Sequence, residues 1–127
     1  MAVTVVSNRA KIAAWVHVNA ANGTIVIAGN NSVSTIAAPN ETILGAYITQ
    51  AFWGAGSTGQ IQLRRNGVLV AGYDSSGYFD YSGNGVEFNI NSTANVDITF
   101  TDPTIQTILI ELQKVCDYSA NTDYFKG

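Results

Sequence analysis

Apolar and polar residues alternate along much of this chain, which is the pattern of β-strands with one buried face. From Ile12 to Val18 every second residue is apolar, and Asn22-Gly23 then ends the run as a turn. The runs 86–90 and 96–100 alternate in the same way, and the short polar link between them suits a hairpin. The pattern therefore predicts strands over these three stretches.

Shorter and longer apolar runs lie between them. Residues 24–28 and 33–38 are each long enough for one small strand, and turn residues follow both. The run 42–53 is apolar on both faces, so we expect a central strand of a sheet there. One face would carry Leu44, Ala46, Ile48 and Phe52, and the other Ile43, Tyr47 and Trp53.

Turn residues divide the second half of the chain. Asn66-Gly67 lies between two alternating runs, and this dipeptide favours a type I′ hairpin turn because both of its residues tolerate positive φ. The glycine-rich stretches 54–59 and 73–85 are expected to be loops. The last apolar run, 105–115, is predicted as a strand, with a helix as the alternative because its apolar spacing also fits a helical period.

About eight short strands with frequent turns are typical of an antiparallel β-sandwich or jelly roll. The composition agrees, because Val, Ile and Thr together number 36 and Leu only 5. No linker-like stretch divides the 127 residues, so we expect a single domain over residues 1–127. Its two ends, 1–10 and 117–127, are candidates for extended arms.

The charge pattern excludes several kinds of partner. Six basic and nine acidic residues give a net charge of −3 without a basic cluster, so nucleic acid is not expected. No apolar run approaches the roughly 18 residues of a membrane span, and the N-terminus lacks a signal-peptide pattern. We therefore expect neither a membrane partner nor classical secretion.

Motifs for catalysis and metal binding are missing from the sequence. His17, the only histidine, has no nucleophile or metal-ligand motif beside it, and Cys116, the only cysteine, is interpreted as a small strand-end residue. Residues 74–80 are rich in oxygen-bearing side chains but lack EF-hand spacing, so a polar turn is favoured over a calcium site. We expect a non-enzymatic protein with no catalytic residues, no metal and no other cofactor.

Aromatic residues are the main candidates for binding. Exposed rings on a β-sandwich can stack on sugars, whereas covered rings fill cores or subunit interfaces. A core or interface role is favoured here. The alternative is a carbohydrate-binding module whose glycan-stacking residues are Trp53, Tyr73, Tyr78 and Tyr81.

Two further features indicate contacts with other subunits. Arg64 and Arg65 are consecutive in a strand and point to opposite faces, so the inward one needs a carboxylate or a subunit boundary. Ala2–Val6 is apolar and β-prone, and an exposed strand of this kind tends to add to the edge of a neighbouring sheet. The candidate interface residues, two of them from the C-terminal tail, are Val3, Val5, Val6, Arg64, Arg65, Tyr124 and Phe125.

Three stretches of the sequence resemble a known class of protein. They are 45–54 (GAYITQAFWG), 62–67 (QLRRNG) and 74–85 (DSSGYFDYSGNG). Together they are similar to small virion structural proteins of tailed bacteriophages, especially those of marine hosts, over roughly residues 20–115. The resemblance implies a β-sandwich or jelly-roll module without catalytic residues, several kinds of which decorate the outer capsid shell.

The resemblance and the residue pattern together predict a capsid decoration (cement) protein that binds the outer shell and stabilises it through subunit contacts. Its partners would be the major capsid protein or other virion proteins and further copies of itself, with a trimer favoured. Its location would be the surface of the phage particle, after synthesis in the host cytoplasm. A carbohydrate-binding module for attachment to the host surface is the alternative function.

Overall fold

The computed structural model describes residues 2–80 and 93–116, and all regular structure within these ranges is β-strand. The strands are β1 (Val3–Arg9), β2 (Ala13–Asn19), β3 (Gly23–Ile25), β4 (Gly29–Asn30), β5 (Thr42–Arg65), β6 (Val68–Asp80), β7 (Val96–Phe100) and β8 (Thr107–Cys116). They form one antiparallel sheet in the order β1-β2-β8-β5-β7-β3, in which β4 and β6 also pair with β5. The predicted all-β, antiparallel architecture is confirmed.

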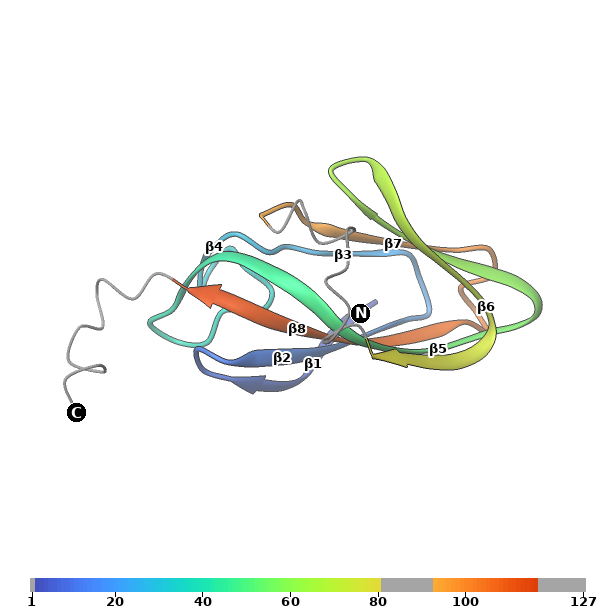
Figure 1. Cartoon of the computed structure of the whole chain (residues 1–127), viewed down its shortest axis with the longest axis horizontal. Helices are drawn as coiled ribbons and strands as arrows, with labels where there is room; N and C mark the ends of the chain where they lie inside the picture. Colours follow the sequence, from blue (N-terminus) through green and yellow to red (C-terminus); the bar gives the residue numbers. More distant parts are fainter. Residues whose placement is uncertain (1, 81–92, 117–127) are drawn as a thin grey trace.

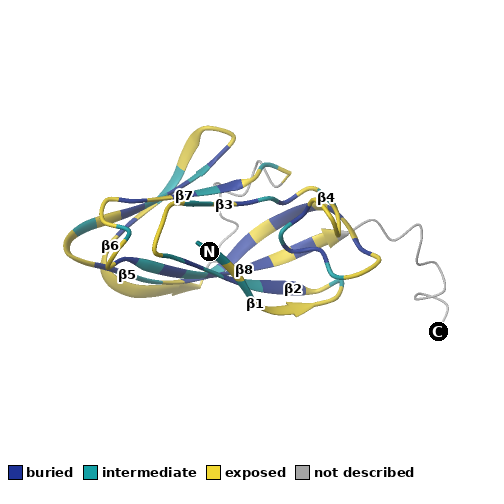
Figure 2. Ribbon diagram, turned by 180° about the vertical axis from the view of Figure 1, so that it is seen from behind, coloured by how far each residue is buried: buried dark blue, intermediate teal, exposed yellow. Residues whose placement is uncertain are grey.

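The sheet is curled into a half-barrel, and the long strand β5 makes it curl (Figure 1). Residues 43–54 of β5 pair with β8, whereas residues 61–65 pair with β7. Between these two halves the register against β6 shifts at Gly54 and again at Gly56, as in β-bulges that bend a strand. As a result, β3 and β7 lie opposite β1, β2 and β8 in both views of the molecule (Figures 1 and 2).

The concave side of the curled sheet holds the core. Every second residue of β8 points inward, and its inward residues Ile108, Ile110 and Leu112 are completely buried. They belong to one cluster with the buried residues of the other strands, which is visible as dark bands along the ribbon in Figure 2. Burial of this many branched aliphatic side chains is the main force that stabilises the sheet.

The turn with the clearest sequence signal, Asn66-Gly67, was predicted correctly. Strand β5 ends at Arg65 and β6 begins at Val68, so Asn66 and Gly67 form a two-residue turn with φ of 53° and 77°. These angles are those of the expected type I′ turn. The run 96–100 forms β7, and the last run forms the strand β8 rather than a helix.

The two predicted glycine-rich loops were wrong where the structure describes them. Residues 54–59 lie within β5, and residues 73–80 lie within β6, while 81–85 fall outside the described residues. The two small-residue runs pair with each other, Gly54 opposite Ser76 and Gly56 opposite Ser75. Each run supplies backbone partners to the other, so both belong to the sheet although neither has a strong strand propensity of its own. The paired residues Gly56 and Ser75 have positive φ, 81° and 55°, where the register shifts.

The two short strands predicted after β2 were also only partly correct. Strand β3 covers Gly23–Ile25 rather than 24–28, and residues 33–38 form turns instead of a strand. Thr35 explains the second difference, because its hydroxyl accepts a hydrogen bond from Val26 N at 2.9 Å and its N–H donates to Val26 O at 2.8 Å. Such local side-chain bonds compete with a sheet ladder. The predicted strand 86–90 lies outside the described residues.

The predicted faces of residues 42–53 were wrong because the strand is bulged twice. Strand β5 is central as expected, since it pairs with β4, β6, β7 and β8. Its register against β8 shifts between Ile43 and Gly45 and between Ile48 and Gln50, and each shift exchanges the two faces. Ile43 and Ile48 are consequently both buried, while Phe52, placed on the same face as Ile48 by simple alternation, is 40% exposed.

Candidate functional site

The convex face of the sheet carries a row of residues from four neighbouring strands. His17 of β2 lies opposite Leu109 of β8, Leu109 opposite Phe52 of β5, and Phe52 opposite Tyr78 of β6. The neighbours of this row along β2 and β8, such as Val16 and Ile110, point to the core. The row therefore lies on the outer surface, where apolar side chains are in contact with solvent.

Aromatic rings contact one another at tilted angles along this outer row. The rings of Phe52 and Tyr78 have centroids 4.3 Å apart, and Trp15 lies on the other side of Phe52 at 5.8 Å. Tyr78 is 48% exposed and donates its hydroxyl hydrogen to Gln50 Oε1 at 2.8 Å. Partial desolvation, together with the nearby carboxylates of Asp80 and Glu111, raises the pKa of Tyr78. The phenol is neutral at ordinary pH and acts as a hydrogen-bond donor at the rim of the aromatic row.

A groove of about 630 Å³ runs beside these rings and is open to solvent. Its lining comes from β1, β2, β5, β6 and β8 and comprises Val6, His17, Phe52, Trp53, Gly54, Ser76, Gly77, Thr107 and Leu109. Gly54 leaves its part of the lining open, because the nearest atom to a Cβ built on it is Thr107 Cγ2 at 3.8 Å, whereas Gly77 is covered by the Trp53 ring. The polar side chains His17 and Thr107 are hydrogen-bonded to each other, so the remaining lining is mainly apolar. We call these nine residues the outer groove.

Strand β1 forms one end of the sheet beside the outer groove. Among the described strands it pairs with β2 alone, so its second edge carries backbone groups that no described strand covers. Val3 and Val5 are half-buried and pack against the core, whereas Val6 is 60% exposed at a bulge between Val5 and Ser7. The segment predicted as an arm is thus an edge strand of its own sheet, and Val6 turns outward into the groove.

Two of the predicted glycan-stacking residues, half-buried Trp53 and buried Tyr73, contact each other. Tyr73 is only 5% exposed and stacks on Trp53 with ring centroids 4.2 Å apart. The indole Nε1 of Trp53 donates to Asp74 O at 2.9 Å. Tyr73 therefore has no free ring face for a sugar, which corrects its place in that set. Tyr78 is exposed as that set requires, and Tyr81 lies outside the described residues.

The two consecutive arginines have different environments, as their alternation predicts. Arg65 is completely buried, which removes it from the predicted interface. Its guanidinium donates to Ala46 O at 2.9 Å and to Ala94 O at 2.9 Å, and burial lowers its pKa, an effect that nearby Tyr47 partly offsets. Arg64 is half-buried and donates to Gln62 Oε1 at 2.7 Å. The predicted interface residues Tyr124 and Phe125 fall outside the described residues.

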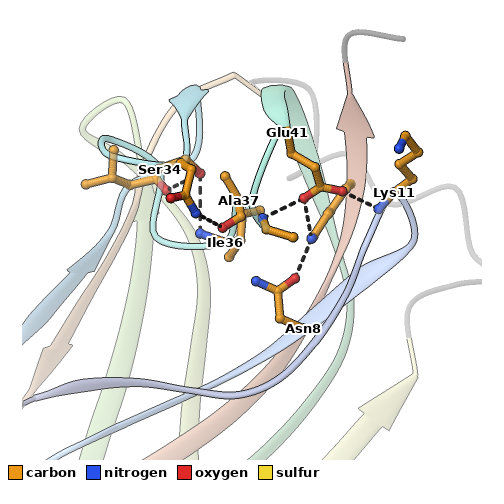
Figure 3. Close-up of polar contacts among 10 residues, drawn as sticks. Asn8, Lys11, Ser34, Ile36, Ala37 and Glu41 are labelled. Carbon is orange, nitrogen blue, oxygen red and sulfur yellow. Dashed lines mark hydrogen bonds and ion pairs between the residues drawn. The ribbon is translucent and has the colours of Figure 1, made fainter. Parts of the chain in front are cut away.

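A second candidate site is buried where β8 meets the turn before β5. Lys114 of β8 and Glu41, which precedes β5, form an ion pair at 2.8 Å, with 0% and 2% of their side chains exposed. The second Glu41 oxygen accepts a hydrogen bond from Lys11 N, and the first also accepts one from Ala38 N at 2.7 Å. Lys114 Nζ additionally donates to Asn8 Oδ1. Figure 3 shows Asn8 and Glu41 on either side of this amine.

The electrostatics of this pair follow from its partners. Burial by itself would raise the pKa of Glu41, but the hydrogen bonds from Lys114 and from the N–H groups of Ala38 and Lys11 outweigh burial and lower it. The pair is therefore charged at neutral pH. The sequence contained a signal for it that was not used: Lys114 continues the inward series of β8 after Ile110 and Leu112, and an inward lysine requires an acidic partner.

The remaining predicted features have simple structural outcomes. His17 lies in β2 and its Nε2 contacts Thr107 Oγ1, and Cys116 is the last residue of β8. Residues 74–80 form part of β6 rather than a polar turn. Within 2–80 and 93–116, no three His, Cys, Asp or Glu side chains are grouped as metal ligands, and no helix is present that could cross a membrane.

Comparisons with known proteins return no match, whether with protein families, with curated proteins or with solved structures. The function is therefore inferred from the residues and their geometry.

Proposed function

We propose that this chain is a non-enzymatic virion structural protein of a tailed bacteriophage, a capsid decoration protein that binds the outer shell and neighbouring copies of itself. The observation that carries the proposal is the outer groove beside the open edge of β1. An apolar surface that crosses five strands and adjoins an open sheet edge is typical of a surface that is covered on assembly.

The exposure of individual residues supports this interpretation. Val6, Phe52 and Tyr78 are 60%, 40% and 48% exposed, and together they form one continuous apolar surface. A large aromatic side chain in the centre of an interface contributes much of the binding energy, because it removes a large area from water. The low charge of the chain, with a net value of −3, limits repulsion between closely packed copies.

The fold is compatible with the same proposal. The curled sheet brings β3 and β7 opposite β2 and β8 over one core, as the two layers of a sandwich do. A jelly-roll module of this kind remains part of the proposal.

The proposal is tested by mass spectrometry of purified virions and by light scattering on the purified chain. We expect the protein at high copy number in virions and a homo-oligomer, with a trimer favoured, in solution. Phe52→Glu should convert the oligomer to monomer and abolish binding to shells. Leu69→Glu is the matched control, because Leu69 is similarly exposed at 50% but lies outside the outer groove. A monomeric chain that is absent from virions would contradict the proposal.

The carbohydrate-binding function remains a second candidate because Phe52 and Tyr78 are exposed beside the polar side chain of Gln50. Their ring centroids are 4.3 Å apart, and Trp15 lies on the other side of Phe52 at 5.8 Å, so Tyr78 is the ring with a face left for a sugar. Binding to a glycan array that Tyr78→Ala abolishes, by a chain that is monomeric, would favour this module over the structural protein.

A further inference from the structure

Three side chains from distant parts of the sequence meet at the buried end of the sheet. Lys114 lies on β8, Asn8 lies on β1, and Glu41 lies in the turn before β5. Lys114 Nζ contacts Asn8 Oδ1 and is 2.8 Å from Glu41 Oε1 (Figure 3). One amine therefore contacts both a carboxamide from β1 and a carboxylate from the turn before β5.

The contact places a nucleophile beside an electrophile. Lys114 Nζ contacts Oδ1 of Asn8, and the amide carbon Cγ is bonded directly to that oxygen, so the contact brings the amine to the group it would attack. The lysine side chain has no exposed surface, so no bulk water competes with it for the amide. Asn8 is itself exposed, which gives a small leaving molecule a way out to solvent.

Glu41 is held where a proton carrier would be needed. Its two oxygens accept hydrogen bonds from Lys11 N and Ala38 N, so two backbone N–H groups fix the carboxylate next to the amine. A lysine ammonium has no lone pair and cannot attack, but a proton transfer to Glu41 would leave a neutral amine and a neutral acid. The pair is charged at neutral pH, and burial lowers the cost of reaching this neutral form for the reaction.

We propose that Lys114 and Asn8 join in an intramolecular isopeptide bond, and that Glu41 is the catalytic acid and base of this reaction. Glu41 takes one proton from the Lys114 ammonium, and the freed Nζ lone pair forms a bond to Asn8 Cγ. The carbonyl electrons move to Oδ1, return to re-form the C=O group, and expel the amide nitrogen. Glu41 passes its proton to this leaving nitrogen, which departs as ammonia. Nζ then still carries one proton more than an amide nitrogen holds, and this proton moves to the ammonia to give ammonium. The net change is one ammonium and one amide from one lysine ammonium and one asparagine, without any oxidant or co-reactant.

The bond would link β1 directly to β8 across β2, which lies between them. Lys114 and Asn8 are 106 residues apart, so the link would close nearly the whole chain into one covalent ring. It would also fix the edge strand that borders the outer groove. This role does not depend on the proposed virion function, because the reaction needs only the folded chain.

Peptide mapping of the full-length protein, denatured after purification, tests the proposal. Trypsin cannot cleave after an acylated lysine, so the linked protein should give one branched species made of residues 1–9 and 66–126. The intact mass should be lower than the sequence mass by one ammonia, about 17 Da. Separate peptides ending at Lys114 and containing unmodified Asn8 would overturn the proposal.

Variants identify the role of each residue. Glu41→Gln keeps the size of the side chain but cannot exchange the proton, so the branched species should be lost or reduced by orders of magnitude. Asn8→Ala, at an exposed position, should fold and show the full sequence mass. An ammonia loss without the branched species would come from an asparagine that cyclises on its own backbone, and that result also overturns the proposal. Full bond formation in Glu41→Gln would remove Glu41 from the mechanism.

Discussion

Gly77 of β6 lies directly beneath the indole ring of Trp53 on β5. The two residues are cross-strand partners, and a Cβ atom built on Gly77 would lie 2.7 Å from Cζ2 of the ring. The ring in turn stacks on Tyr73 and is bonded to Asp74 O. Glycine at position 77 is therefore required by the ring that covers it, and this contact holds β5 and β6 together next to the bulges of the half-barrel.

Replacing Gly77 with alanine should therefore destabilise the protein. The added methyl group must displace the Trp53 ring, which we expect to cost about 1–3 kcal/mol of unfolding free energy. Tryptophan fluorescence during urea unfolding measures both the midpoint and the environment of the ring. Gly72→Ala is the control on the same strand, because its nearest contact is the flexible Gln60 side chain at 3.5 Å. Equal effects of the two substitutions would contradict this explanation.

Substitution of Arg65 should be far more costly than substitution of its neighbour. Arg65 is fully buried and donates to carbonyl groups of Ala46 and Ala94, which would lose their donor. We expect Arg65→Ala to cost about 3–5 kcal/mol and to leave little folded protein. Arg64→Ala should cost less than about 1 kcal/mol, since this half-buried residue bonds to Gln62. Circular dichroism and thermal unfolding of both variants measure the difference.

The buried pair should make the protein sensitive to acid. The folded state lowers the pKa of Glu41, so its contribution is fully present above the ordinary value of 4.5 and is lost as the pH falls through the lowered pKa. The measurement is best made in Asn8→Ala, where Lys114 stays an amine. Unfolding free energies should decline below about pH 4.5 more steeply in this variant than in the double variant Asn8→Ala, Glu41→Gln. Parallel pH curves for the two proteins would contradict the assigned role.

The turn between β5 and β6 allows the energetic cost of a positive φ to be measured at a position without side-chain packing. Gly67 has a φ of 77° and no atom within 4 Å of a Cβ built on it. Gly67→Ala should therefore lose about 1 kcal/mol through the positive φ alone. Asn66→Gly, which keeps a residue that tolerates positive φ, should change the stability less, as measured by chemical unfolding.

The sequence was sufficient wherever a local signal determines the structure. Asn66-Gly67 specifies its turn through the φ values of two residues, and the run 96–100 alternates without interruption, so both predictions were correct. The place of 54–59 within a strand could not be predicted in this way. Gly54 and Gly56 belong to β5 because Ser76 and Ser75 pair with them, and these contacts exist only once β5 and β6 have paired.

The site residues show the same division. Aromatic residues were chosen as candidates from the sequence, but simple alternation failed to separate Phe52 from the buried Ile48 because the bulge between Ile48 and Gln50 exchanges the faces of β5. Glu41 and Asn8 could not be joined to Lys114 from spacing, since 73 and 106 residues separate them. Only the topology brings these segments together.

The position of β2 between β1 and β8 also determines when this protein can fold. Residues 13–19 find one of their two partner strands in residues 107–113, near the far end of the sequence. During synthesis β1 and β2 can form a hairpin early. The backbone groups on the second edge of β2 have no partner strand until most of the chain has left the ribosome. The hairpin of β5 and β6 needs no such delay. We therefore infer that the centre of the sheet forms first and that docking of the N-terminal hairpin onto β8 is the last and slowest step of folding.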